Sequence, residues 1–238
     1  MDEPLRVLCV MAHPDDVEFG AAGSVALWVD QGAEVTYVIV TDGSTGTADT
    51  GLVGGKLAEI RREESIRAAK VVGVENVIFL GYRDGYVEPT LDLRRDLARE
   101  FRKARPQRMV TMDPQSLPGG WFVNHPDHRA IGQSALDITV TAGTTPGHFP
   151  ELLEDGYEPW RGLREIYLFG PGGGPIAVDI TDSVDRKIEA LRCHESQVGD
   201  WDVATMMRGW MAQNGREHGY QYAELFQQFG TMEGLRAD

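Results

Sequence analysis

The chain has 238 residues, 37 acidic against 23 basic side chains and a formal net charge of -14, which together favour one compact domain over residues 1–238. The acidic excess disfavours nucleic acid and anionic membrane surfaces as partners, because it leaves no basic surface for phosphate contacts. Two cysteines, no stretch of membrane-spanning length and an acidic N-terminus predict a cytoplasmic protein without a disulfide framework.

Apolar runs of strand length alternate with helical patterns along the first part of the chain. Strands are expected at RVLCVMA (6–12), EVTYVIVT (34–41), NVIFLG (76–81) and RMVTMDP (108–114), and helices over 17–31, 57–72, 91–104 and 125–141. This alternation predicts an α/β fold: a Rossmann-like, mostly parallel sheet with helices on both faces. Ligands bind beyond the carboxyl ends of the strands in such sheets, so the loops that follow the strands are the candidate site.

Beyond residue 143 the alternation weakens. The Gly- and Pro-rich segment 143–162 is long enough to be functional on length alone, and we expect it to form part of the pocket rim and to select the substrate. Short strands are expected at REIYLFG (164–170) and IAVDIT (176–181), followed by a helix from about 182 to 198. The last segment, 199–226, has helical spacing.

The loop after the first predicted strand, AHPDD, contains His13, Asp15 and Asp16. A histidine and a carboxylate three residues apart on a strand-to-helix turn can converge on one cation, because the turn rotates both side chains toward the open end of the strand. The alternative is that Asp15 or Asp16 caps the following helix, with Pro14 holding the turn.

The loop after the fourth predicted strand repeats these elements in NHPDHRA, which contains His125, Asp127 and His128. Two imidazoles and one carboxylate form the ligand set of a catalytic zinc, which keeps its fourth position for water. We therefore choose His13, Asp16 and His128 as ligands of Zn²⁺. The same set also forms the facial triad of non-haem iron(II) oxygenases, which is the alternative function. Hydrolysis is favoured because it uses a carboxylate beside the metal as a base.

The paired HPDD and HPDH motifs resemble those of the LmbE/PIG-L superfamily of zinc-dependent N-acetylglucosaminyl deacetylases. RREESIRAAKVVGV (61–74) and KIEALRCHESQV (187–198) are similar to the family's Arg-x-x-Glu helix and its late Lys...His-x-Ser-Gln helix, whereas Ala22 departs from a glycine pair common in the family. The resemblance implies a hydrolase that removes an N-acetyl or related N-acyl group from an N-acetylglucosaminyl-type small molecule or glycoconjugate. By position it implies zinc ligands His13, Asp16 and His128, a general base Asp15, assistance to the tetrahedral intermediate by His125, a histidine-orienting Asp127, and a substrate contact from Arg61.

Other residues have a functional and a structural interpretation. Trp121 can stack on a sugar ring or belong to the core, and Asp42 can line the pocket or form a turn. His194 can reach the site from the late helix or be a plain polar position, and Arg61 can pair with Glu64 on the helix surface.

Several properties stay open. A protonated His125 is expected to stabilise the oxyanion, and either Asp15 or His125 can protonate the leaving amine. The substrate can be a thiol-pathway sugar, a natural product, a chitooligosaccharide or a non-sugar amide, and a homo-oligomer is equally open. A nucleotide-binding module is disfavoured because no Gly-x-Gly-x-x-Gly turn follows the first strand.

Overall fold

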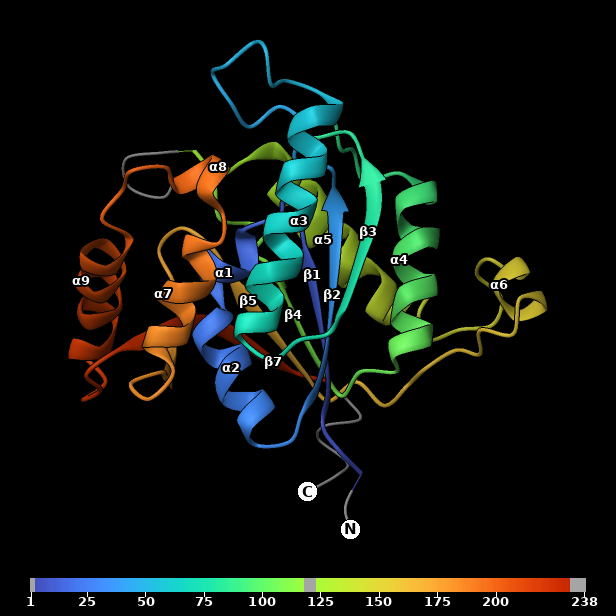
Figure 1. Cartoon of the computed structure of the whole chain (residues 1–238). Coiled ribbons are helices and arrows are strands. Elements are labelled where there is room, and N and C mark those ends of the chain that lie inside the picture. The colour runs from blue at the N-terminus through green and yellow to red at the C-terminus, as the bar shows by residue number, and fades with distance from the viewer. Residues whose placement is uncertain (1–2, 118–122, 232–238) are drawn as a thin grey trace.

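A computed structural model describes residues 3–117 and 123–231, and these form one seven-stranded sheet in the order β3-β2-β1-β4-β5-β7-β6 (Figure 1). The strands β1 to β5 pair in parallel, and β7 is antiparallel to both of its neighbours, β5 and β6. The predicted mostly parallel sheet is therefore confirmed. The strand bounds are β1 Arg6–Met11, β2 Glu34–Thr41, β3 Asn76–Tyr82, β4 Arg108–Met112, β5 Glu165–Phe169, β6 Ile176–Asp179 and β7 Ala223–Gly230.

Helices cover both faces of the sheet, as predicted. The helices α4 and α5 pack together on one face, whereas α1, α2 and α3 gather around α7 on the other (Figure 1). The helix bounds are α1 Asp16–Gly20, α2 Ala22–Asp30, α3 Gly55–Val71, α4 Leu91–Ala104, α5 Pro126–Val140, α6 Glu151–Glu154, α7 Val184–Arg192, α8 Glu195–Val198 and α9 Val203–Arg216.

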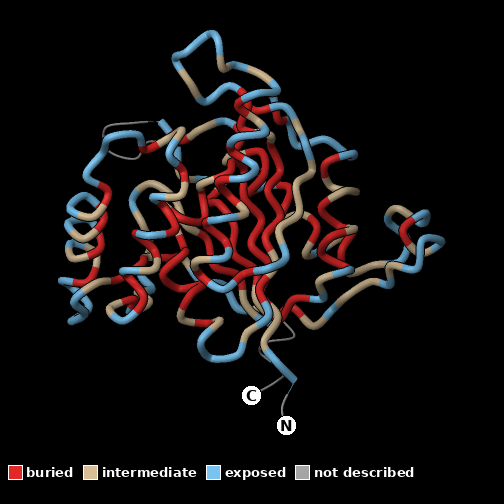
Figure 2. Tube along the Cα trace, viewed as in Figure 1, coloured by how far each residue is buried: buried red, intermediate tan, exposed pale blue. Residues whose placement is uncertain are grey.

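The hydrophobic core lies between the sheet and the helices that pack on its two faces. Figure 2 shows buried residues concentrated in the central strands and exposed residues on the outer sides of the helices. All of β1 after its first residue is buried, which explains why its sequence is apolar at nearly every position.

The sheet places four loops at one edge. The carboxyl ends of the parallel strands β1 to β4 point to the upper edge in Figure 1. The chain leaves β1 toward β2 on one side, and β4 pairs with β1 on the other, so the strand order reverses between β1 and β4. Such a switch point opens a crevice between neighbouring loops, where ligands of this architecture bind.

Three predicted helical segments differ from the structure. The first helix is divided at Ala21 into α1 and α2, and the helix expected over 182–198 is divided at His194 into α7 and α8. The end of the last segment is a strand, β7, instead of a helix. Helix α9 ends at Arg216, and the chain reverses at Gly219 with a φ of 77°. The residues of β7 then adopt the strand conformation because they pair with β5 and β6.

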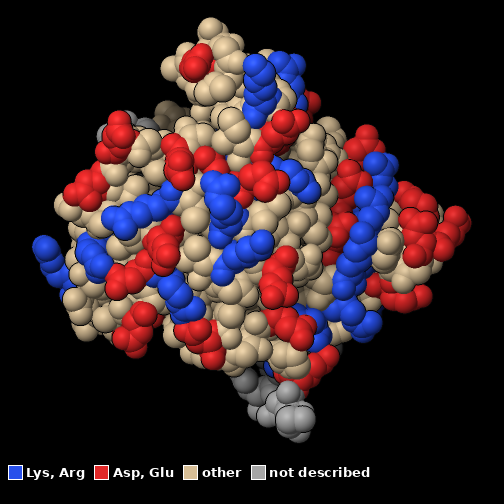
Figure 3. All heavy atoms as spheres, viewed as in Figure 1, with Lys and Arg blue, Asp and Glu red and all other residues tan. Residues whose placement is uncertain are grey.

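Charges of both signs are mixed on the face shown in Figure 3. Basic side chains on the outer side of α4 pair with acidic ones: Arg94 lies 2.7 Å from Asp137, and Arg99 lies 2.9 Å from Asp96. Within residues 3–117 and 123–231, no helix has the length and apolar character that crossing a membrane requires.

Candidate active site

The turn after β1 sends two aspartates in different directions. Asp16 Oδ2 accepts a hydrogen bond of 2.6 Å from the His13 backbone N–H, which ties the carboxylate to the end of the strand. Asp15 has a φ of 141°, in the region that favours glycine, and its side chain caps no N–H of α1. Helix capping therefore does not explain either carboxylate. Backbone strain of this kind persists only where the surrounding structure holds it, and it is common at functional sites.

The structure brings His13, Asp16 and His128 together. His13 Nδ1 lies 3.1 Å from His128 Nε2, and His128 Nε2 lies 3.2 Å from Asp16 Oδ1. His13 Nδ1 is 3.5 Å from Asp16 Oδ2. His13 and Asp16 are buried, whereas the His128 side chain is partly exposed. The three predicted ligands thus form a group that can hold a metal ion.

The far nitrogen of each imidazole faces an acceptor. His13 Nε2 lies 3.1 Å from Asp84 Oδ1, and His128 Nδ1 lies 3.0 Å from Asn124 Oδ1. The Asn124 amide nitrogen donates to the Asp113 carbonyl oxygen, which leaves the amide oxygen for His128. The Asn124 oxygen favours the His128 tautomer with its proton on Nδ1, and the Asp84 carboxylate favours a proton on His13 Nε2, which is the arrangement found around metal ions in proteins.

Sequence reasoning did not find Asp84 and Asn124. Asp84 follows β3 and also accepts a hydrogen bond from the Thr45 backbone N–H, and Asn124 directly precedes the HPDH motif. Both lie in loops at the carboxyl ends of strands, and this position in the sequence is the one feature that could have marked them as site residues.

Asp127 joins α5 to the loop after β3. Its carboxylate is completely buried and accepts hydrogen bonds from the backbone N–H groups of Gly85, over 2.7 Å, and Val87, over 3.2 Å. Asp127 Oδ2 is also 3.5 Å from His13 Nε2. The histidine that Asp127 faces is therefore His13, and His13, His125 and Asp127 form a second cluster of ligand atoms that shares His13 with the first.

His125 lies beside both ligand histidines, with ring centroids 4.7 Å from His13 and 5.5 Å from His128. Its Nδ1 accepts a hydrogen bond from the Asp127 backbone N–H at the start of α5. Burial, together with His13, lowers the pKa of His125 below its ordinary value. The backbone donor on Nδ1 leaves Nε2 as the nitrogen that carries the proton of a neutral ring, and the lowered pKa favours this neutral form over the protonated form expected from the sequence.

Arg61 reaches from α3 to Asp15. Arg61 Nη2 lies 3.1 Å from Asp15 Oδ2, and the guanidinium donates to the carbonyl oxygens of Gly43 and Pro14. Arg61 is buried, so the surface pair with Glu64 does not form; Glu64 instead binds the backbone N–H and hydroxyl of Ser196. Burial raises the pKa of Asp15 to about 6, although Arg61 opposes this rise.

The remaining predicted residues are placed as follows. Asp42 Oδ1 accepts hydrogen bonds from the backbone N–H groups of Ser44 and Asp84, and so shapes the loop that carries Asp84. His194 is completely buried at the start of α8, where its Nε2 lies 3.1 Å from Glu18 Oε2. His194 also opposes electrostatically the rise that burial causes in the pKa of Asp15, and its contact with a substrate stays a prediction. Trp121 lies outside the described residues.

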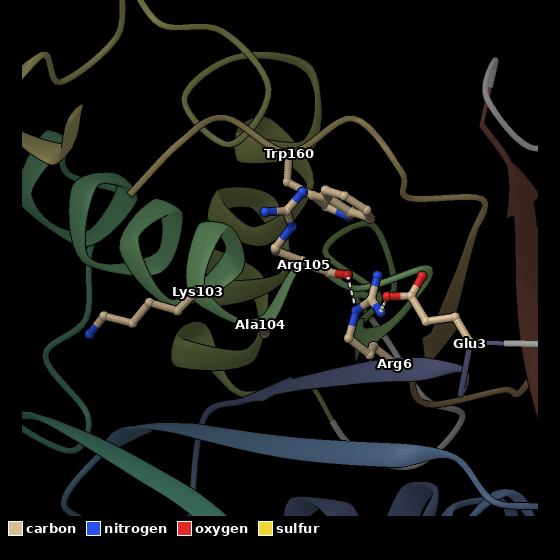
Figure 4. A pocket seen from close by; sticks show the side chains of 6 residues that line it. All are labelled: Glu3, Arg6, Lys103, Ala104, Arg105 and Trp160. Atoms are coloured by element: carbon tan, nitrogen blue, oxygen red, sulfur yellow. Dashed lines mark hydrogen bonds and ion pairs between the residues drawn. The ribbon is translucent and has the colours of Figure 1, made fainter. Parts of the chain in front are cut away.

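The segment 143–162 does not form the pocket rim of this chain, so that expectation is wrong. It connects the end of α5 to the start of β5 and therefore lies at the amino ends of the strands. Trp160 donates a hydrogen bond to the Pro106 carbonyl oxygen, just before β4. Figure 4 shows its ring in a hollow beside Arg105 and Arg6, with Glu3 paired to Arg6. This hollow is at the edge of the sheet opposite to the metal-binding group.

A His, Asp and His group that can hold a metal ion thus lies at the switch point of a mostly parallel α/β sheet. The chain belongs to the PIG-L (LmbE) family, since residues 8–139 match the sequence model of that family, described as GlcNAc-PI de-N-acetylase.

Individual relatives have named activities. The chain is 32% identical over 222 residues to diacetylchitobiose deacetylase of Thermococcus kodakarensis, a match that covers 92% of this chain and 81% of that protein. It is 34% identical to N,N'-diacetylchitobiose deacetylase from Pyrococcus horikoshii in a solved structure, with a TM-score of 0.86 over 98% of this chain and 85% of that one. It is also 26% identical over 218 residues to 4-oxalmesaconate hydratase of Pseudomonas putida, a match that covers 86% and 79% of the two chains.

Proposed function

We propose that this protein is a zinc-dependent hydrolase that removes the N-acetyl group from an N-acetylglucosaminyl-type small molecule or glycoconjugate. The observation that carries the proposal is the pair of imidazole nitrogens, His13 Nδ1 and His128 Nε2, 3.1 Å apart beside the Asp16 carboxylate. The named activities of the two diacetylchitobiose deacetylases support the same reaction.

The donor set fits zinc. Ligand atoms 2.0–2.1 Å from Zn²⁺ at tetrahedral angles lie about 3.3 Å from one another. His128 Nε2 lies 3.1 Å from His13 Nδ1 and 3.2 Å from Asp16 Oδ1, close to this value, whereas the 3.5 Å separation joins His13 Nδ1 to the other carboxylate oxygen, Asp16 Oδ2. One ligand atom from each of the three residues lies within 4.8 Å of the others. Three protein ligands of this kind would leave a bound Zn²⁺ with a position for water, as in catalytic zinc sites.

Asp15 is the proposed proton acceptor. Zn²⁺ bound by this group supplies Lewis-acid chemistry that makes water a nucleophile near neutral pH. The Asp15 carboxylate takes a proton from the attacking water, because it lies next to the group, pairs with Arg61 and is not one of the three ligands. The water oxygen bonds to the acetyl carbon, and the carbonyl oxygen gains negative charge.

The remaining steps use the same residues. The uncharged His125 donates a hydrogen bond from Nε2 to the developing oxyanion. Asp15 then passes its proton to the amine nitrogen as the carbon–nitrogen bond breaks, which yields acetate and a free amine. We assign this proton donation to Asp15 because burial raises its pKa, whereas burial lowers the pKa of His125.

A substrate screen tests the proposed function. Purified, zinc-loaded protein is incubated with acetylated sugars of the thiol-pathway, natural-product and chitooligosaccharide classes and with a non-sugar amide. Acetate and primary amine are both quantified, and 4-oxalmesaconate is included because one relative is named as its hydratase. We expect equimolar acetate and amine from at least one acetamido sugar. Hydration of 4-oxalmesaconate without acetate release from any sugar would contradict the proposal.

A further inference from the structure

Tyr86 is the most exposed aromatic residue in the described part of the chain, at 64%. It lies in the loop after β3, two residues beyond Asp84, which contacts His13. Single exposed aromatic residues are normal on protein surfaces and need no function by themselves. Tyr86 differs from an ordinary surface residue because both its backbone and its ring are held in place beside the proposed active site.

The backbone on each side of Tyr86 is fixed to the start of α5. The N–H groups of Gly85 and Val87 donate to the two carboxylate oxygens of Asp127, over 2.7 and 3.2 Å. Asp127 is completely buried, and its Oδ2 lies 3.5 Å from His13 Nε2. The segment that carries Tyr86 is thus held directly against the group proposed to bind zinc.

The ring of Tyr86 is held by Arg83. The guanidinium carbon of Arg83 lies 3.9 Å from the centroid of the ring, and the Tyr86 backbone N–H donates to the Arg83 carbonyl oxygen. Within residues 3–117 and 123–231 the Arg83 guanidinium contacts the Tyr86 ring and forms no ion pair, so its N–H groups are available to donate. The pair therefore presents a positioned aromatic surface next to unused hydrogen-bond donors.

We propose that Tyr86, supported by Arg83, is a platform for a second sugar ring, linked to the acetamido sugar that reacts at the zinc site. The C–H face of a pyranose packs on an aromatic ring, and its hydroxyl groups accept hydrogen bonds from a guanidinium. This inference rests on the proposed function and deepens it, because it assigns the substrate to the disaccharides and longer oligosaccharides.

The test compares one sugar with two. We measure kcat/KM for N-acetylglucosamine and N,N'-diacetylchitobiose with wild type, Tyr86→Ala, Tyr86→Phe and the matched control Tyr220→Ala, an exposed tyrosine in the turn after α9. Tyr86→Ala is expected to lower kcat/KM for the disaccharide about tenfold, mainly through KM, because the aromatic contact is lost. Its kcat/KM for the monosaccharide and its zinc content are expected to stay at the wild-type level. Tyr86→Phe, which keeps the ring, should restore the disaccharide preference.

The outcomes separate this inference from the proposed function. An active wild type whose preference for the disaccharide survives Tyr86→Ala, or equal losses on both substrates, would overturn the platform alone. A wild type that releases no acetate would overturn the proposed function. Calorimetric titration with chitobiose then decides the platform without turnover: weaker binding by Tyr86→Ala than by Tyr220→Ala supports it, and equal binding refutes it.

Discussion

Replacing Asp15 by asparagine should remove activity and stabilise the metal-free protein. Burial raises the pKa of the Asp15 carboxyl from 3.8 to about 6, even with Arg61 3.1 Å away. At about 1.4 kcal/mol for each pKa unit, ionised Asp15 costs the folded protein about 3 kcal/mol. The side-chain amide of the variant cannot ionise, and Arg61 keeps the carbonyl oxygens of Gly43 and Pro14 as acceptors. The variant therefore avoids most of this cost.

The sign of the effect fixes its pH dependence. Because the pKa of Asp15 is raised in the folded state, the protonated carboxyl contributes fully to the free energy of unfolding of wild type below about pH 4. Wild type loses this contribution as the pH rises through about 6. Urea unfolding of chelator-treated proteins should give equal stabilities near pH 4 and an advantage of about 3 kcal/mol for Asp15→Asn at pH 7. The zinc-loaded variant should keep its metal and lose turnover by about 10²–10⁴-fold. A variant less stable than wild type at pH 7, or one that retains full kcat, would refute the reasoning.

Three further predictions concern the ligands, their support and the fold. His128→Ala and Asp16→Ala should lose most of their metal in elemental analysis, and excess zinc should partly restore the activity of Asp16→Ala; full metal occupancy would contradict the ligand assignment. Asn124→Ala removes the acceptor 3.0 Å from His128 Nδ1 and should weaken zinc binding by about 10–100-fold in chelator competition, whereas unchanged affinity would count against that role. Lys187→Met removes a buried ammonium that donates to Glu224 and should lower the free energy of unfolding by about 3–5 kcal/mol, compared with less than about 1 kcal/mol for Arg186→Ala, whose ion pair with Asp30 is partly exposed to solvent.

The sheet and the metal group could be predicted because both have strong local signals. Strands buried on two faces are apolar throughout, so β1 to β4 stand out from the amphipathic helices between them. The order of parallel strands and helices also places their following loops at one edge. Two histidine- and aspartate-rich loops on neighbouring strands, β1 and β4, therefore had to meet, which brings His13 and Asp16 to His128.

Features set by distant contacts could not be predicted in this way. The strand β7 continues a helical pattern in the sequence, and its conformation depends on pairing with β5 and β6. The segment 143–162 has the composition of a binding loop. One side chain from α4, Arg102, nevertheless donates to four carbonyl oxygens in and around this segment, those of Ala142, Thr145, His148 and Tyr157. The role of Asp84 likewise depends on the fold. Only the pairing of β3 with β2 brings the loop after β3, and with it the Asp84 carboxylate, next to His13.

The most direct test of the central claim is a zinc titration of the chelator-treated protein, followed by acetate release from N,N'-diacetylchitobiose. The three-ligand group formed by His13, Asp16 and His128 predicts that activity is absent without metal and rises in proportion to added zinc. It also predicts that activity saturates at about one zinc per chain. Acetate release that continues at full rate in the metal-free protein, or a zinc-saturated protein that releases none, would contradict the account.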